Sequence, residues 1–382
     1  MHFQIKEVHF FYMKCIEIIK NIESWAPKEI AWQKDNVGLQ IGDTDRQIKN
    51  ILLCLDINEC VVEEALINKC NLIISHHPFF FSPIKKIDIT NDHSARLIQK
   101  IIKHDIILYS AHTNLDYTKE GVSYQLAKRL ELQNINFLVN LKTNQFKISV
   151  FVPEDACEKV AEAIFSAGGG VIGNYSRCSF RTKGKGTFKG SGKSRPAIGK
   201  KEEYKVVDEV KLEIMVDRWK LNTVLSELKK VHPYEEIAYD VVPLDNQNVN
   251  YGIGAVGYLP KDYNQKDFFS FLADKLTVKN FRYTNGKNKM IRKVAVCGGS
   301  GSEYFQDAIS NNCDAYITAD IKYHTFQDAE NEILLIDAGH YETEIFSLNE
   351  IKKRITLQLN QHKTTKVYLY SGSTNPVIFY NN

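Results

Sequence analysis

The first third of the chain alternates short apolar runs with segments that have helical periodicity. From Ile16 to Trp25 the apolar side chains recur every three residues, which predicts an amphipathic helix. Continuous apolar runs follow at residues 51–55, 72–74 and 106–109, and helix-like segments separate them. Such runs are typical of strands that are buried on both faces of a largely parallel sheet.

The last third, from about residue 248, repeats this pattern with apolar runs at residues 294–297, 315–318 and 333–337. IKNILLC, which ends at Cys54, aligns without gaps to IRKVAVC, which ends at Cys297. A second alignment pairs AHTNLD (residues 111–116) with GHYETE (residues 339–344). We therefore predict two duplicated β-α-β units that form one pseudo-symmetric α/β core, with sites at the carboxyl ends of its strands.

Between about residues 145 and 245 the pattern is different. KISVFVP and VKLEIMV alternate as strands do, and the predicted elements follow the order β-α-β-β-α-β. This is the order of a ferredoxin-like unit, so we predict an α+β domain inserted into the α/β core. The predicted boundaries are residues 1–143 and 248–382 for the two halves of the core, and residues 144–247 for the insert.

The composition fits a globular protein and excludes several other classes. Of 382 residues, 43% are hydrophobic and 25% are charged, a balance that disordered and fibrous chains lack. A net charge of +3 is too small to drive nucleic-acid binding, so we expect no nucleic-acid partner. No apolar stretch approaches the roughly 20 residues of a membrane span, and the N-terminus lacks a signal-peptide pattern. We therefore expect no membrane association and a cytoplasmic location.

The eight cysteines include no C-x-x-C pair, and most of them lie in apolar segments. In a cytoplasmic protein this pattern predicts reduced core thiols rather than disulfides or zinc ligands.

The sharpest chemical signal is Ser75-His76-His77-Pro78, directly after an apolar run. Two adjacent imidazoles that leave a strand end can point in different directions, so each could serve a different ion of a close metal pair. The alternative is a pair of solvated or core histidines. Their position at a strand end, where α/β proteins form their ligand sites, favours the metal site.

A second signal is His340-Tyr341-Glu342-Thr343-Glu344, again directly after an apolar run. Residues i and i+4 of a helix share one face, so His340 and Glu344 could bind one ion together. His112 and Asp116 keep the same spacing in the other half of the core. Imidazoles and carboxylates suit borderline divalent ions such as Zn, Mn, Fe, Co or Ni, and ligand type does not choose among these metals. A carboxylate can also bridge two ions, which acidify a water between them.

Two further segments carry weaker signals. Gly298-Gly299-Ser300-Gly301-Ser302 fits neither the dinucleotide fingerprint nor a P-loop, so a tight turn with close packing is favoured over phosphate binding. His324 follows the apolar run 315–318 and could orient a metal ligand, face a substrate or cap a helix, and we expect one of the functional roles.

Several motifs occur in a fixed order: WQKDNVGLQIG (residues 32–42), SHHP, AHTNLD, CGGSGS, ITADIKYH and DAGHYETE. Together they resemble the signatures of the GTP cyclohydrolase 1 type 2 homologue family, and the resemblance covers nearly the whole chain. CSF, GKGTF and HPYEE are similar to the PII-like or CutA-like module that the long members carry as an insert. The first twelve residues have no counterpart in this pattern, so Met13 is a candidate for the natural start.

The resemblance implies two divalent metal ions per chain. It implies as ligands His76, His77, Asp116, His340 and Glu344, with Glu344 as the bridge. His112 matches a family position close to the metals, so we interpret it as a further ligand or, as our candidate catalytic residue, a proton-transfer group. Members resemble one another in forming toroidal homohexamers, which predicts the same assembly here.

The activity that the family name implies is hydrolytic opening of the guanine imidazole ring of GTP, with loss of C8 as formate. We therefore predict a metal-dependent hydrolase that acts on a nucleotide or a related phosphorylated small molecule. The alternative is a metal-binding regulatory or adaptor protein, in which the PII-like insert senses a ligand and the metals are structural or stored.

Overall fold

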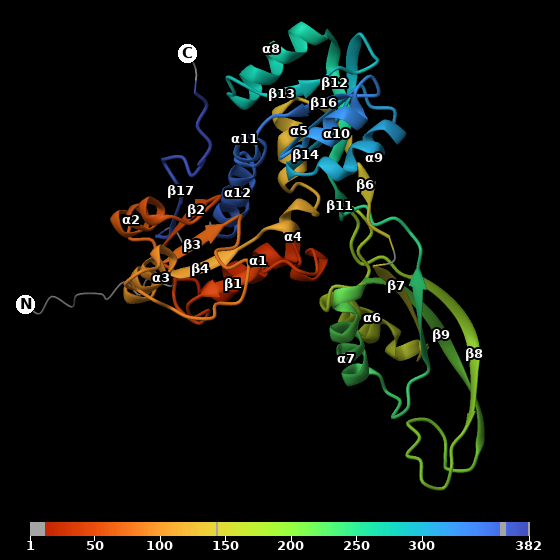
Figure 1. Ribbon diagram of the computed structural model, residues 1–382. Helices are drawn as coiled ribbons and strands as arrows, with labels where there is room; N and C mark the ends of the chain where they lie inside the picture. Colours follow the sequence, from red (N-terminus) through yellow and green to blue (C-terminus); the bar gives the residue numbers. More distant parts are fainter. Residues whose placement is uncertain (1–11, 143, 360–363, 381–382) are drawn as a thin grey trace, which may run out of the picture. The chain divides into compact units, whose positions relative to one another are not determined.

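The computed structural model describes residues 12–142, 144–359 and 364–380 and has a mixed α/β fold. The chain forms two compact units (Figure 1). Unit 1 joins the residues up to 139 with those from 251 onward, and unit 2 comprises residues 140–250. Whether Met13 is the natural start depends on residues 1–11, which lie outside the described residues.

Unit 1 contains a five-stranded sheet with the strand order β1-β4-β3-β2-β17. The last four of these strands are parallel, and β1 runs antiparallel to β4. Helices α2 (Glu59–Ile67) and α3 (His93–Lys103) connect β2 to β3 and β3 to β4. The strands are β1 (Gly38–Ile41), β2 (Asn50–Cys54), β3 (Leu72–Ser75), β4 (Ile107–Ser110) and β17 (Lys366–Leu369). The apolar runs of the first third are therefore strands, and β3 and β4 are buried along their whole length.

A second sheet of unit 1 has the strand order β13-β16-β15-β14-β12-β5. Its central strands β14, β15 and β16 are parallel, and the flanking strands are antiparallel to their neighbours. Helices α9 (Phe305–Ser310) and α10 (Tyr323–Ala329) connect the central strands. The strands are β5 (Gln133–Asn136), β12 (Ala255–Asn264), β13 (Arg282–Thr284), β14 (Met290–Ser300), β15 (Ala315–Ala319) and β16 (Leu334–Asp337).

Four further helices complete the cores of the two sheets. Helices α1 (Cys15–Trp25) and α12 (Ser347–Leu359) pack into the core of the first sheet, and α5 (Val122–Arg129) and α8 (Gln265–Leu276) into that of the second. The helix predicted from Ile16 exists, but α1 buries Ile18 whereas Ile16 is only half-buried. None of the helices in the described ranges is long and apolar enough to cross a membrane.

Unit 2 forms a four-stranded antiparallel sheet with the order β10-β7-β9-β8. Along the chain its main elements are strand, helix, strand, strand, helix, strand, and the two helices share one apolar core with the sheet. They are β7 (Gln145–Pro153), α6 (Cys157–Ser166), β8 (Phe180–Lys189), β9 (Tyr204–Asp217), α7 (Leu221–Val231) and β10 (Tyr239–Leu244).

All eight cysteines lie in described residues and are free thiols, and six of them are buried. Cys60 is exposed and Cys178 is half-buried, so these two are not the core thiols that we expected.

We predict that unit 1 folds and binds metal without unit 2. One reason is that unit 2 has an apolar core of its own. The other is that β6 (Val139–Asn140) and β11 (Gly252–Ile253), which flank unit 2 along the chain, are hydrogen-bonded neighbours, so a short linker can join them. Replacing residues 141–249 by a short flexible linker should leave a cooperative thermal transition and an unchanged metal content. An unfolded product, or one that cannot be loaded with metal, would show that unit 1 depends on unit 2.

Candidate metal centre

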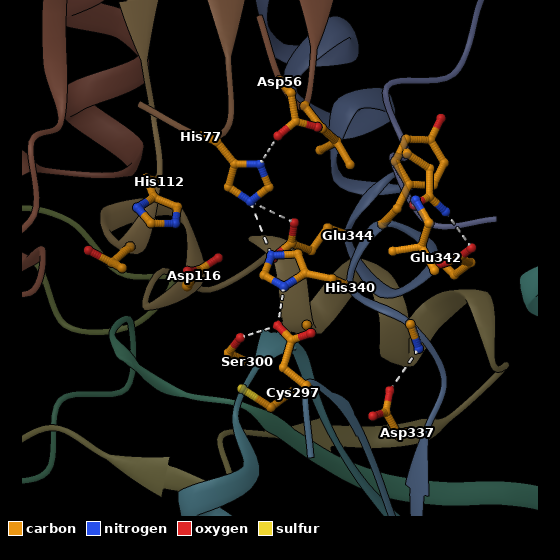
Figure 2. A pocket seen from close by; sticks show the side chains of 18 of the residues that line it. Asp56, His77, His112, Asp116, Cys297, Ser300, Asp337, His340, Glu342 and Glu344 are labelled. Atoms are coloured by element: carbon orange, nitrogen blue, oxygen red, sulfur yellow. Dashed lines mark hydrogen bonds and ion pairs between the residues drawn. The ribbon is translucent and has the colours of Figure 1, made fainter. Parts of the chain in front are cut away.

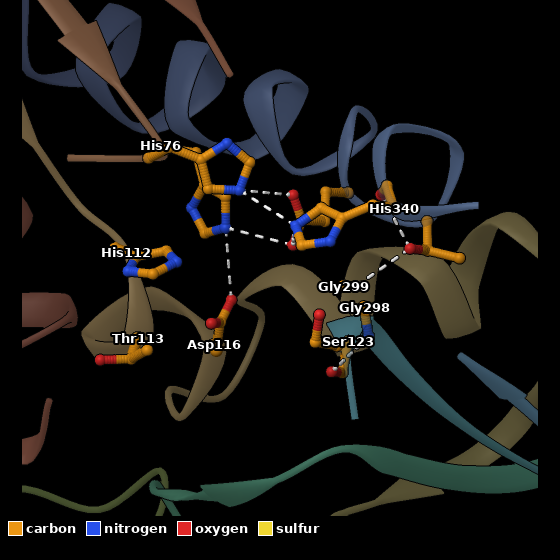
Figure 3. A network of polar contacts seen from close by, with 12 residues as sticks. His76, His112, Thr113, Asp116, Ser123, Gly298, Gly299 and His340 are labelled. Carbon is orange, nitrogen blue, oxygen red and sulfur yellow. Dashed lines mark hydrogen bonds and ion pairs between the residues drawn. The ribbon is translucent and has the colours of Figure 1, made fainter. Parts of the chain in front are cut away.

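The candidate ligands lie where strands of unit 1 end (Figures 2 and 3). His76 and His77 follow β3, and His112 lies between β4 and the short helix α4 (Thr113–Asp116). His340 begins the short helix α11 (His340–Glu344), which follows β16. Both sheets therefore contribute a strand end and a short helix to one cluster of imidazoles and carboxylates.

The Glu344 carboxylate lies at the centre of this cluster. Its Oε2 is 3.1 Å from Nε2 of His77, and its Oε1 is 3.1 Å from Nε2 of His340 and 3.7 Å from Nε2 of His76. The Nε2 atoms of His77 and His340 are 3.2 Å apart. Asp116 Oδ1 lies 3.5 Å from His76 Nε2. The structure thus brings together all five residues that the sequence suggested as ligands.

His112 faces the same cluster. The donor atoms of His76, His77 and His112 lie within 4.8 Å of one another, and so do those of His77, His340 and Glu344. His77 is common to both groups. The described residues therefore offer two overlapping sets of donors, either of which could hold a metal ion.

Hydrogen bonds on the outer side fix the orientation of the four imidazole rings. His76 Nδ1 lies 2.8 Å from the carbonyl oxygen of Ala111, which can only accept, so Nδ1 carries the proton and Nε2 faces the cluster. In the other three rings Nδ1 contacts a carboxylate, which accepts its proton in the same way. The pairs are His77 with Asp56 at 2.7 Å, His340 with Asp320 at 2.6 Å and His112 with Asp35 at 2.9 Å. Metal-binding histidines commonly have such an outer partner.

The sequence patterns gave no role to these three carboxylates. Asp56 and Asp320 lie just beyond the ends of β2 and β15, so position at a strand end was the signal that could have found them. Asp35 lies in the WQKDNVGLQIG motif, which was used only for the resemblance. His324 is exposed in α10, with Nδ1 3.4 Å from Gln327 Oε1. Asp320, rather than His324, contacts the cluster from this segment.

Gly299 makes room for the Glu344 carboxylate. Its φ of +63° is unfavourable for other residues, and a Cβ atom there would lie 2.2 Å from Glu344 Oε1 and 3.2 Å from His340 Nε2. The Gly299 N–H donates to Thr343 Oγ1 at 3.0 Å. The close packing predicted for the glycine-rich segment is therefore present, and the group packed against it is part of the cluster. The predicted tight turn is wrong, because Gly298, Gly299 and Ser300 form the end of β14, where its register against β15 shifts.

The cluster contains buried polar atoms that lack a regular hydrogen bond. Among the described residues these atoms include His76 Nε2, Asp116 Oδ1 and Glu344 Oε2. A buried polar atom without a partner costs roughly 1–3 kcal/mol, so three in one place need an explanation. A divalent cation between the imidazoles and carboxylates would satisfy all three, and the nitrogen and oxygen donors fit such an ion.

Without a cation, protons on the histidines balance the carboxylates. Burial lowers the pKa of His77, but hydrogen bonds and charges of Asp56 and Glu344 outweigh this effect and raise that pKa to about 10. Burial likewise lowers the pKa of His340, but Glu344 and Asp320 raise it to about 9. Burial raises the pKa of Asp116 to about 7. A metal ion that binds here therefore replaces protons, as metal ions generally do at histidine sites.

Comparisons with known proteins identify the family. A family model described as "Duf34/NIF3 (NGG1p interacting factor 3)" matches residues 13–376. This chain belongs to the DUF34/NIF3 family. A Bacillus subtilis member named "GTP cyclohydrolase 1 type 2 homolog" is 38% identical over 366 residues, which are 95% of this chain and 98% of that protein. A member of the same name from Staphylococcus aureus is 33% identical and covers 93% of this chain and 95% of its own length.

A solved structure supports the same assignment. The crystal structure of "Bacillus cereus protein related to NIF3" matches with a TM-score of 0.84 and 35% identity, over 97% of this chain and all of that chain. The DUF34/NIF3 fold therefore extends over nearly the whole chain. The resemblance inferred from the motifs is confirmed.

Thr374, in the C-terminal segment of this DUF34/NIF3 protein, contacts the carboxylate that orients the candidate ligand His77. Its Oγ1 donates to Asp56 Oδ2 at 2.7 Å, while Asp56 Oδ1 accepts from His77. Thr374→Val removes the hydroxyl, and we predict that metal affinity falls by about tenfold, the low end of the range for an outer partner of a ligand. Competition with a chromogenic chelator measures this affinity. Thr374→Ser keeps the hydroxyl and should retain it, so equal affinities in the two variants would contradict the prediction.

Proposed function

We propose that this DUF34/NIF3 protein holds two divalent metal ions and acts as a hydrolase. His76, His77, Asp116, His340 and Glu344 would hold the ions. The observation that carries the proposal is the position of Glu344, whose two oxygens contact different histidines within two overlapping donor sets. A carboxylate in this position is suited to bridge a pair of ions.

Two ions held close together supply an acidified water and an electrophilic position for the atom under attack. The protein's own contribution is to orient the metal ligands and to exclude bulk water from them. Asp56 and Asp320 fix the His77 and His340 rings, and burial of Glu344 at 3% side-chain exposure keeps bulk water from its carboxylate.

His112 is our proposed proton-transfer residue. Hydrogen bonds from His112 and Thr113 outweigh the effect of burial and lower the pKa of Asp35 to about 2, so this carboxylate stays ionised. Asp35 therefore holds His112 Nδ1–H and leaves Nε2 directed at the cluster. The His112 side chain keeps 19% exposure, whereas that of His76 is fully buried, so His112 is the more accessible to a substrate.

The predicted substrate is a nucleotide or a related phosphorylated small molecule, and the names of the relatives support a reaction of the GTP cyclohydrolase type. The test has two stages. Elemental analysis after reconstitution with Zn, Mn or Fe should give two ions per chain. Mass spectrometry of the loaded protein with a nucleotide panel should then find a hydrolysed product. No bound metal would overturn the whole proposal, and bound metal without turnover would overturn the hydrolase.

The second candidate function is a metal-binding regulatory or adaptor protein. It is favoured by a cavity of about 580 Å³ within unit 2, whose lining includes Phe151, Phe188 and Tyr234. Such a cavity is large enough for a small ligand. We propose that unit 2 is a PII-like insert and that the two β-α-β halves of unit 1 are duplicates. The homohexamer is likewise a proposal, and sedimentation of the metal-loaded chain tests it.

A further inference from the structure

The walls of the cavity beside the metal centre are strongly acidic. This cavity of about 1020 Å³ lies within unit 1 (Figure 2). Its described lining contains one arginine and no lysine, but seven carboxylates: Asp56, Asp116, Glu303, Asp320, Asp337, Glu342 and Glu344. The arginine, Arg282, donates to the Asp337 carboxylate and to the carbonyl oxygen of Ile321. Its charge is therefore already matched within the wall.

A pair of bound divalent ions would leave the net charge of the cavity wall away from the histidines negative. Their four positive charges do not exceed the five negative charges of the carboxylates next to the histidines, namely Asp35, Asp56, Asp116, Asp320 and Glu344. Outside this group the cavity presents Glu303, Asp337 and Glu342 against Arg282 alone. A phosphate chain that extends from the metals along this wall would meet charge of its own sign.

Aromatic side chains line the same cavity. Trp32, Phe81 and Phe379 are 55%, 67% and 53% exposed, and they come from three distant parts of the chain. The Phe81 ring lies edge-on to the His112 ring, with 6.2 Å between the centroids. The backbone N–H of Trp32 donates to Oγ1 of Thr113, the residue after His112, at 2.9 Å, so the Trp32 backbone is fixed near His112. One exposed ring, that of Phe81, thus lies beside the proposed proton-transfer residue, and Trp32 lines the same cavity, so a flat ligand can pack on them.

We propose that this cavity recognises an uncharged planar heteroaromatic ring, as in a nucleobase or nucleoside, and disfavours a nucleoside triphosphate. The inference rests on the proposed function for the position of the metals, and it goes beyond the substrate class proposed there, because an uncharged ring ligand carries no phosphate. The exposed aromatic rings supply the attraction, and Glu303 and Glu342, whose charges Arg282 does not match, repel polyanions.

Titration calorimetry with the full-length, metal-loaded protein tests this proposal. The ligands are guanosine, GMP, GTP and inorganic tripolyphosphate, each at 50 mM and 500 mM NaCl. We expect guanosine to bind at least about tenfold more tightly than GTP at low salt, and tripolyphosphate to bind no better than GTP. Salt should strengthen GTP binding by screening repulsion and leave guanosine binding unchanged. Metal content is assayed after each titration, since a triphosphate can extract metal ions.

Two variants locate the effect. Trp32→Ala should weaken guanosine binding by about tenfold, whereas Trp32→Phe keeps a stacking face and should retain most of it. Glu303 is exposed, and Glu303→Gln should improve GTP binding without changing guanosine binding.

GTP that binds more tightly than guanosine and loses affinity with salt would overturn the proposal. So would a metal-loaded protein that binds none of the ligands. If the chain binds no metal, the proposed function fails, but the test of this inference remains. Guanosine should then still bind the wild type more tightly than Trp32→Ala, and equal or absent binding in both would overturn the inference.

Discussion

Glu344→Ala should abolish tight binding of both metal ions. Glu344 contacts three of the candidate histidines, with its two oxygens on different rings, so its loss removes a donor from one set and a carboxylate contact from His76 and His77 of the other. We expect affinity to fall by more than the roughly 10- to 100-fold that the loss of an outer partner costs. Elemental analysis after dialysis against a weak chelator, followed by competition titration, measures the loss at each position.

The matched control is Glu342→Ala on the same helix. Glu342 Oε1 accepts a hydrogen bond from Asn375 Nδ2 at 2.8 Å, and within the described part of the chain Glu342 forms no ion pair with a candidate histidine, so this variant should keep both ions. Thermal unfolding of both variants in excess chelator separates loss of metal from loss of fold. A Glu344→Ala protein that folds and loses only one ion would contradict the bridging role.

His112→Ala should lower turnover by roughly two to four orders of magnitude while both ions stay bound, because this is the usual contribution of a lost acid–base group. We expect this because Asp35 accepts the His112 Nδ1–H, which leaves His112 Nε2 facing the cluster, and because the ring is partly exposed. Single-turnover kinetics on whichever substrate the nucleotide panel identifies, with metal content determined on the same sample, measures both quantities.

Asp35→Asn offers a graded comparison with His112→Ala. It keeps the shape of the partner but removes the charge that holds the imidazole, so turnover should fall less than in His112→Ala. If His112→Ala loses one ion together with activity, His112 is a sixth ligand and its proton-transfer role is wrong. This outcome would leave the other five proposed ligands unaffected.

Sequence patterns predicted the strands of unit 1 well because buried parallel strands are continuous apolar runs, and few other structures produce them. The histidines could be placed for the same reason, since the ends of parallel strands meet at one edge. Asp56 escaped notice because a single aspartate after a strand is common on protein surfaces. Only the distance to His77 distinguishes it.

Thr374 could not have been predicted at all from local pattern. It lies more than three hundred positions from Asp56 along the chain, and nothing in its immediate neighbours marks it as a partner. The phase of α1 was misjudged for a different reason. Ile16 and Ile18 are both apolar, and the helical spacing alone fits either of them as part of the buried face.

Gly299, at the end of β14, gives the candidate metal centre a signature that can be read from the sequence alone. A methyl group at this position would occupy the space of the Glu344 carboxylate, and the backbone conformation would itself be strained. Any natural or engineered relative that carries a side chain here must therefore hold its carboxylate elsewhere. Position 299 can thus serve as a filter when genomes are searched for members of this family that have lost the ability to bind metal.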